Sequence, residues 1–346
     1  MRDQGVEGLG KEMKSSFVTD LKTGQAVDDY FVLAEKNMSR KKDGGNYLTI
    51  ALSDKTGTVK GVVWDNVEQL RDSPAAGDFV RAAGAVSEFR GALQVVVKRL
   101  ESCAAEAVDP ADFIPATRRD TAAMFTKLVS LGRKVENARL RALLEAFWAD
   151  AAFVDQFKAA PAAKHMHHAY LGGLLEHTLS VALLAERVGE HYSGIDRDLL
   201  LTGAILHDIG KIKEFVYDRR IDYSDAGRLV SHIVIGVEMV QDKIAGISGF
   251  PEHLAMLVKH LLISHHGDRA YGSPEPPKTL EAVLLNYLDE IDAKINGIRE
   301  FMENHTTDGA WTRYNRPLER FFYSGTAVPE PGTPGPAVPD PLRKDE

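Results

Sequence analysis

The chain has 346 residues, of which 44% are hydrophobic and 27% charged, and its formal net charge is −8 at pH 7. That length suits two domains with their own cores, and the negative charge argues against a protein that coats nucleic acid by bulk electrostatics. The single cysteine, Cys103, excludes an internal disulfide and fits a reducing compartment. Residues 1–25 lack the apolar stretch of a signal peptide, and no window reaches the ~18 apolar residues of a membrane span. We therefore expect a cytoplasmic protein with no membrane partner.

Charge and histidine divide the chain into two unlike halves. Residues 1–102 contain 15 Lys and Arg against 15 Asp and Glu, so the whole charge deficit lies in the remainder. All 12 histidines lie at or beyond His165. This distribution predicts two domains with different chemistry.

The first half has the pattern of short β-strands. Alternating apolar residues predict strands at Tyr30–Lys36, Tyr47–Ser53, Gly57–Trp64, Phe79–Phe89 and Ala92–Leu100. Between the third and fourth strands, residues 66–71 have room for one or two helical turns. Five strands with a short helix at that point is the plan of an OB barrel. We place this barrel at residues 17–103, after an N-terminal extension of residues 1–16.

From Arg118 onward the apolar spacing becomes helical. After a linker and helical segment at residues 104–159, the predicted helices are Gly173–His191, Arg197–Lys211, Leu229–Ala245, Pro251–His265 and Thr279–Glu303. They predict an all-α bundle over residues 160–323, so the fold class is a multidomain β + α protein. Residues 324–346 are rich in proline and poor in apolar residues, which predicts disorder.

The strongest chemical signal is the run from His207 to Lys211, which reads His-Asp-Ile-Gly-Lys. Other candidate ligands stand on different predicted helices, so a bundle can direct them into one pocket: His177, His232, His265, His266 and Asp289. Any one of these histidines alone would more simply be a core or helix-end residue. As a set they indicate a metal site, because an adjacent His and Asp supply a nitrogen ligand and a carboxylate that can bridge two ions.

Such a site predicts phosphate chemistry. A mixed N/O donor set suits Mn²⁺, Fe²⁺, Co²⁺ or Ni²⁺ at least as well as Zn²⁺. Two such ions could activate a water and stabilise the attacking and leaving oxygens of a phosphate ester. Lys211, one helical turn beyond Asp208, could neutralise charge on the phosphoryl group. The catalytic candidates are therefore Asp208 and Lys211.

The pattern resembles the HD superfamily of metal phosphohydrolases, whose signature is H…HD…H…H…D. Over residues 17–320 the chain more closely resembles the YhaM-type 3′→5′ exoribonucleases, which join an OB domain to an HD domain. The motifs that carry this resemblance are Asp54-Lys55-Thr56-Gly57, Val63-Trp64-Asp65, Pro161-Ala162-Ala163-Lys164, His167-His168-Ala169-Tyr170, Gly172 to Thr178, His207 to Lys211, Gly227-Arg228-Leu229, Ser264 to Gly267 and Leu288-Asp289. The HD signature is specific, whereas the barrel motifs depend on their position beside it.

The resemblance implies a ligand set and an activity. It assigns a first metal site to His177, His207, Asp208 and Asp289, with Asp208 bridging to a second site completed by His232 and by His265 or His266. Asp292 is a second-ranked carboxylate. Some members of the superfamily hold a single metal, so the second ion is a hypothesis, and Mn²⁺ is the first choice of ion. The implied reaction is removal of 5′-mononucleotides from the 3′ end of single-stranded RNA through a metal-activated water. Single-stranded DNA is a further candidate substrate. A homo-oligomer is a possible assembly of the chain.

Two regions are candidates for substrate binding. In the helical half, His168 could line the substrate path or pack at a helix start, and Arg228 could contact phosphate or lie in a surface loop. In the barrel, strand alternation places Tyr47, Lys60, Trp64, Arg81, Phe89, Gln94 and Lys98 on the outer face, and Arg90 adds positive charge at the rim. The alternative is that Trp64 and Phe89 pack against the helical domain, since the barrel is net neutral.

Two other functions remain open. The chain could be an HD phosphodiesterase that acts on a cyclic dinucleotide or nucleotide, although Gly267-Asp268-Arg269 replaces the G-Y-P triplet of the branch that degrades cyclic di-GMP. It could also be a non-catalytic RNA-binding adaptor, although every ligand position is retained.

Overall fold

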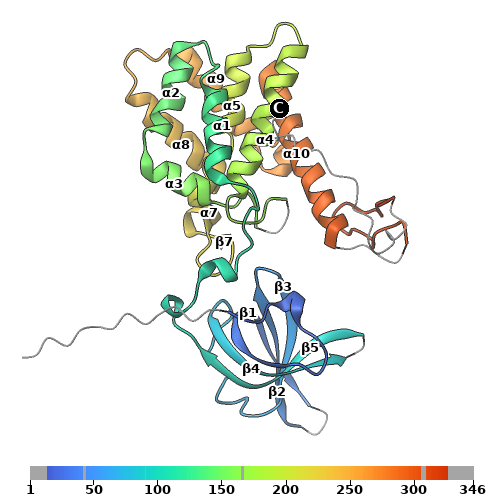
Figure 1. Cartoon of the computed structure of the whole chain (residues 1–346). Coiled ribbons are helices and arrows are strands. Elements are labelled where there is room, and N and C mark those ends of the chain that lie inside the picture. The colour runs from blue at the N-terminus through green and yellow to red at the C-terminus, as the bar shows by residue number, and fades with distance from the viewer. Residues whose placement is uncertain (1–13, 42–43, 90, 165–166, 305–308, 326–346) are drawn as a thin grey trace, which may run out of the picture. The chain divides into compact units, whose positions relative to one another are not determined.

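The computed structural model describes residues 14–41, 44–89, 91–164, 167–304 and 309–325. The chain divides into two compact units, Met1–Glu290 and Ile291–Glu346. The first contains a β-barrel and a helical bundle (Figure 1). No helix within the described residues is long and apolar enough to cross a membrane.

The barrel confirms the predicted OB plan. Its strands are β1 (Ala26–Arg40), β2 (Asn46–Asp54), β3 (Gly57–Val63), β4 (Phe79–Phe89) and β5 (Ala92–Ser102). They close in the order β1-β2-β3-β5-β4, with β3 and β5 parallel. Strand β1 is longer than predicted because it pairs twice. Its first half lies antiparallel to β4 and its second half antiparallel to β2, with an irregularity between Leu33 and Glu35.

Alternation along the strands fills the barrel as the sequence pattern predicts. Leu48, Ile50 and Leu52 of β2 point inward and are buried, whereas the residues between them are only half-buried. Residues 66–71 differ from the expected helix. They form consecutive turns held by i→i+3 hydrogen bonds from Gln69 to Asn66 and from Leu70 to Val67. The end of the predicted N-terminal extension contacts the barrel, where Lys14 donates to the Tyr30 carbonyl (2.6 Å).

The helical part contains more helices than predicted. They are α1 (Thr121–Gly132), α2 (Ala138–Trp148), α3 (Ala151–Ala159), α4 (Gly173–His191), α5 (Arg197–Leu206), α6 (Lys211–Glu214), α7 (Asp225–Leu229), α8 (Ser231–Ala245), α9 (Glu252–Ser264) and α10 (Leu280–Asn304), with a ribbon of β6 (Phe215–Val216) and β7 (Asp222–Tyr223). Only α4 has its predicted bounds. The single helix expected at Arg197–Lys211 is broken by a turn at residues 207–210.

Helices α4 and α5 lie at the centre of the bundle. Every residue from Leu199 to Leu206 is buried, so α5 is covered on all sides. Helix α4 buries Leu174, Leu175 and Leu179 along with His177. The first two ligand-bearing segments, His177 in α4 and His207 at the end of α5, are therefore held by well-packed helices.

The second unit contains the C-terminal part of α10 and residues 309–325. Isolated bridges join Trp311 to Tyr323 and Asn315 to Arg320. Asp292 belongs to this unit, where its carboxylate accepts a hydrogen bond from the Asn296 amide (2.9 Å). Of the predicted disordered tail, residues 326–346 lie outside the described residues, as do residues 1–13 of the predicted extension.

Candidate metal centre and nucleic-acid groove

The His-Asp pair lies on the turn that breaks the predicted helix. The backbone N–H of His207 still donates to Gly203 of α5 (2.8 Å), and that of Lys211 donates back to Asp208 (3.0 Å). Both side chains are buried. The turn lies directly against α8 at Gly210, where an added Cβ would stand 2.0 Å from the carbonyl oxygen of His232. Glycine at this position therefore sets how closely the His-Asp turn approaches the helix that carries His232.

We expect Gly210→Ala to disturb the metal centre. The added methyl group must push the turn and α8 apart, and such overpacking costs about 1–3 kcal/mol of stability while moving His232 away from Asp208. Thermal unfolding and Mn²⁺ binding would measure both effects. Gly246→Ala is the matched control at the end of α8, because its Cβ would meet only the Lys243 carbonyl at 3.4 Å. Wild-type Mn²⁺ affinity in Gly210→Ala would show that this close approach is unimportant to the site.

A first group of ligand-type atoms surrounds His177. Its Nε2 lies 3.1 Å from His207 Nε2, 3.2 Å from Asp289 Oδ1 and 3.4 Å from Asp208 Oδ2. His177 comes from the second turn of α4 and Asp289 from α10. The structure thus brings together all four residues that the resemblance assigns to one site.

A second group lies on the other side of Asp208. The Oδ1 atom of Asp208 lies 3.6 Å from His232 Nε2 and 3.6 Å from His265 Nε2. One ligand atom each from Asp208, His232, His265 and His266 falls within a 4.8 Å cluster. Both members of the His265-His266 pair are therefore in the cluster, where the sequence had left a choice between them. Asp208 is shared by the two groups, one carboxylate oxygen toward each.

The hydrogen bonds made by the Nδ1 atoms set the orientation of the histidine rings. The Nδ1 atoms of His207, His265 and His266 lie 3.0, 2.6 and 3.1 Å from the carbonyl oxygens of Ala204, Leu262 and Tyr271. A carbonyl only accepts hydrogen bonds, so each Nδ1 carries the proton and each Nε2 keeps a lone pair. The inner nitrogens are therefore in the form that binds a metal ion.

The buried polar atoms at the centre fit a divalent cation. His232 Nε2, His265 Nε2 and Asp208 Oδ1 are buried and have no hydrogen-bond partner among the described residues. Buried acceptors without a donor are costly, and lone pairs that converge without a donor are what a cation satisfies. The mixed nitrogen and oxygen donors, without thiolate, suit first-row divalent ions.

Protonation states agree with this fit. Burial, with the neighbouring His265 and His232, lowers the pKa of His266 to about 3. For Asp289, burial raises the pKa, but the contact with His177 outweighs burial and holds the pKa well below the usual range. Metal ligands must be neutral imidazoles and ionised carboxylates. His266 and Asp289 therefore have these forms at neutral pH.

Two predicted residues border the centre and one does not. Lys211 Nζ lies 2.6 Å from Asp208 Oδ2, and its pKa is raised because the charges of Asp208 and Asp289 outweigh burial. His168 is buried in the left-handed region (φ 58°), its Nδ1 lies 2.7 Å from the Tyr170 hydroxyl, and its ring centroid lies 5.6 Å from that of His177. Non-glycine residues in this region gather at functional sites. Arg228 lies outside both ligand groups, exposed and paired with Asp222 (3.1 Å).

One residue of the centre escaped the sequence analysis. Glu214 is buried, and its carboxylate lies 2.8 Å from His232 Nδ1. It is the last residue of α6, and the buried Phe215 follows it directly. A glutamate beside Phe215, six residues after Asp208, was the available signal, but no spacing rule singles it out.

The barrel has a groove on its outer face. Its volume is about 700 Å³, and Tyr47, Lys60 and Trp64 line it together with Phe89 and Gln94. Tyr47 and Trp64 stack on one another, with ring centroids 4.9 Å apart and planes inclined by 23°. Stacked aromatic rings beside a lysine are the elements of a single-strand platform.

Other predicted barrel residues lie elsewhere. Lys98 is exposed on β5 but does not line this groove, and Arg81 pairs with Asp28 (2.8 Å). Arg90 lies outside the described residues. The groove is therefore lined by five of the eight barrel residues predicted as candidates, namely Tyr47, Lys60, Trp64, Phe89 and Gln94.

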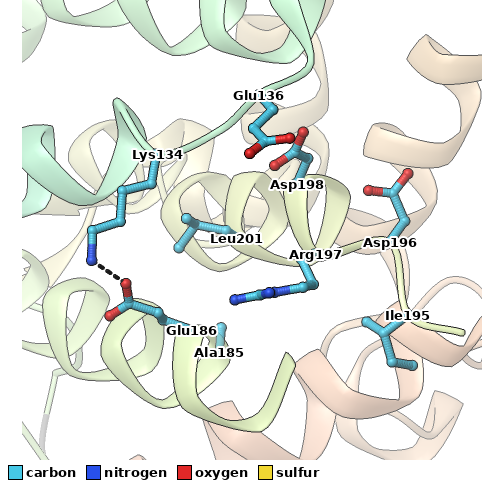
Figure 2. Close-up of a pocket in the computed structure, with 9 residues that line it drawn as sticks. All are labelled: Lys134, Glu136, Ala185, Glu186, Ile195, Asp196, Arg197, Asp198 and Leu201. Atoms are coloured by element: carbon cyan, nitrogen blue, oxygen red, sulfur yellow. Dashed lines mark hydrogen bonds and ion pairs between the residues drawn. The ribbon is translucent and has the colours of Figure 1, made fainter. Parts of the chain in front are cut away.

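A further pocket of about 390 Å³ lies between α4, α5 and the loop that follows α1 (Figure 2). Most of its charged groups already have partners. Lys134 donates to Glu186, Asp198 accepts from the backbone of Asn137 (2.6 Å), and Asp196 caps α5 at Leu199 (3.0 Å). These contacts tie helices together, and this pocket offers no buried unpaired group among its described residues.

Family comparisons agree with both halves of the chain. The model described as an OB-fold nucleic acid binding domain matches residues 36–102, and the HD domain model matches residues 174–294. Together with the geometry, they define a hydrolase that joins an OB barrel to an HD domain. Curated relatives named 3′-5′ exoribonuclease YhaM include those of Listeria monocytogenes (30% identical, covering 89% of this chain and 97% of the relative), Bacillus velezensis (31%, 88% and 96%) and Bacillus subtilis (30%, 88% and 96%). The chain belongs to the YhaM family.

Proposed function

We propose that this chain is a metal-dependent 3′-5′ exoribonuclease that hydrolyses single-stranded RNA from its 3′ end. The observation that supports the metal-dependent part is Asp208, whose two oxygens face two separate groups of ligand atoms. The direction of digestion and the RNA substrate are supported by the name that the curated relatives share.

The chain's own residues would hold two divalent ions. His177, His207, Asp208 and Asp289 would bind one, and Asp208, His232, His265 and His266 the other. When bound, the ions would supply an activated water and positive charge for the phosphoryl oxygens. Mn²⁺ is the first choice for this donor set, with Fe²⁺, Co²⁺, Ni²⁺ and Zn²⁺ as alternatives.

Neighbouring residues would handle the substrate. Lys211 would place a cation against the phosphoryl group, since its ammonium already lies at the shared carboxylate. His168 would line the path of the terminal nucleotide beside His177. Arg228 and Lys98, both exposed, would contact the phosphate backbone.

The barrel groove would hold the single strand upstream of the scissile bond. Bases would stack on Tyr47 and Trp64, and Lys60 would neutralise a phosphate. Stacking is tolerant of base and sugar, so we propose single-stranded DNA as a further ligand of this groove.

The test is digestion of a single-stranded RNA labelled at either end. With Mn²⁺, a 5′ label is expected to give a descending ladder and a 3′ label an immediate mononucleotide, and chelation with EDTA should stop both. Binding without digestion would favour an RNA-binding adaptor. If RNA is neither bound nor cut, and a cyclic dinucleotide is hydrolysed, the chain is a different HD phosphodiesterase.

A further inference from the structure

One carboxylate oxygen of Glu214 contacts His232 at both its ring and its backbone. Its Oε1 lies 2.8 Å from the ring Nδ1 of His232 and accepts the backbone N–H of the same residue at 3.0 Å. Glu214 and the ring it holds are both buried. Because a carboxylate accepts and does not donate, the Nδ1 proton is fixed and Nε2 is directed at Asp208 Oδ1, 3.6 Å away.

The backbone on either side of the contact between Glu214 and His232 has unusual features. Ser231, just before His232, adopts a left-handed conformation (φ 68°) that a serine rarely takes. Gly227 allows α7 to approach, since a Cβ there would lie 2.2 Å from the Glu214 carbonyl and 2.9 Å from its Cγ. Backbone strain and a glycine contact thus both occur where Glu214 meets the start of α8.

Within the second ligand group, the partner of His232 Nδ1 differs in charge from the partners of the other two Nδ1 atoms. The Nδ1 atoms of His265 and His266 are held by the carbonyls of Leu262 and Tyr271, which are neutral. Only His232 in this group is held by a carboxylate. A carboxylate behind a metal-binding imidazole fixes its tautomer and makes the ring a stronger ligand.

We propose that Glu214 is a positioning residue that orients His232 and raises its affinity for the second of two divalent ions, without touching that ion itself. This inference rests on the two-ion site of the proposed function. The competing explanation is that Glu214 only caps α8, because it also accepts a backbone N–H in the first turn of that helix.

The two explanations differ in what Glu214→Gln does. The glutamine oxygen can still accept both hydrogen bonds, so the cap is kept while the charge behind His232 is lost. Glu214→Ala removes both the cap and the charge. Ser224→Ala is the matched control, because the Ser224 hydroxyl caps the adjacent helix α7 at Gly227 (2.9 Å) and contacts none of the ligand histidines among the described residues.

The experiment is titration of metal-free protein with Mn²⁺, with free Mn²⁺ counted by electron paramagnetic resonance and unfolding followed separately by heat. Glu214→Gln should bind one ion as the wild type does and the other about 10-fold more weakly, and Glu214→Ala up to about 100-fold more weakly. Ser224→Ala should melt earlier yet bind both ions normally. Equal weakening of both ions, or unchanged binding in Glu214→Gln, would overturn the role of Glu214. A wild-type protein that binds fewer than two ions would overturn the two-ion site itself, and this inference with it.

Discussion

Replacing Asp208 by alanine should remove both metal ions and lower kcat for RNA digestion by about 10³-fold or more. The reason is geometric, since Oδ2 faces His177 and His207 while Oδ1 faces His232 and His265. No other described carboxylate is shared by the two ligand groups. Metal content per chain, measured beside digestion of labelled RNA, tests the prediction.

Two further variants make this result specific. His232→Ala removes a ligand from one group only, so it should keep one ion where Asp208→Ala keeps none. Asp242→Ala, an exposed aspartate on α8, should behave as wild type. Asp208→Ala removes the buried carboxylate that pairs with Lys211, and loss of one partner of a buried ion pair can cost about 3–5 kcal/mol. Asp208→Asn should therefore be compared and circular dichroism recorded for each protein. Full metal content in folded Asp208→Asn and Asp208→Ala would contradict a bridging role.

The paired substitution Tyr47→Ala/Trp64→Ala should weaken binding of single-stranded RNA by about 10- to 100-fold, since stacking contributes about 1–3 kcal/mol per base. The two rings stack on each other, so their effects should not be additive. Fluorescence anisotropy with metal-free protein measures the affinity without digestion. In Mn²⁺, KM for a long RNA should rise while kcat changes little.

A matched control separates stacking from loss of any surface aromatic residue. Tyr192→Ala removes an exposed ring at the C-terminus of α4, more exposed than Trp64, and should leave RNA binding unchanged. Hydrolysis of a dinucleotide, which can occupy only the metal centre, should be unaffected in the paired variant. Unchanged affinity for long RNA in a folded Tyr47→Ala/Trp64→Ala protein would exclude these rings as a base platform.

The sequence by itself determined the two-part architecture and most of the ligand set. Period-two alternation in β2 identified the barrel core, because successive side chains of a strand face opposite sides. Helical spacing gave α4 its correct bounds. The order of isolated histidines around His207 and Asp208 was sufficient to predict a shared site, since a bundle directs residues from separate helices into one pocket.

Only the tertiary structure decided the details that depend on residues far apart in sequence. The break after Leu206 and the close approach at Gly210 arise because the turn packs against α8. Membership of both His265 and His266 in one cluster depends on how the end of α9 faces Asp208. Glu214 acquires its partner by the fold of α6 and α8. Trp64 and Lys98 directly follow the paired residues Val63 and Val97 of β3 and β5, yet only Trp64 lines the groove. Periodicity reports which face of an element is buried, but it carries no information on which distant side chain that face will meet.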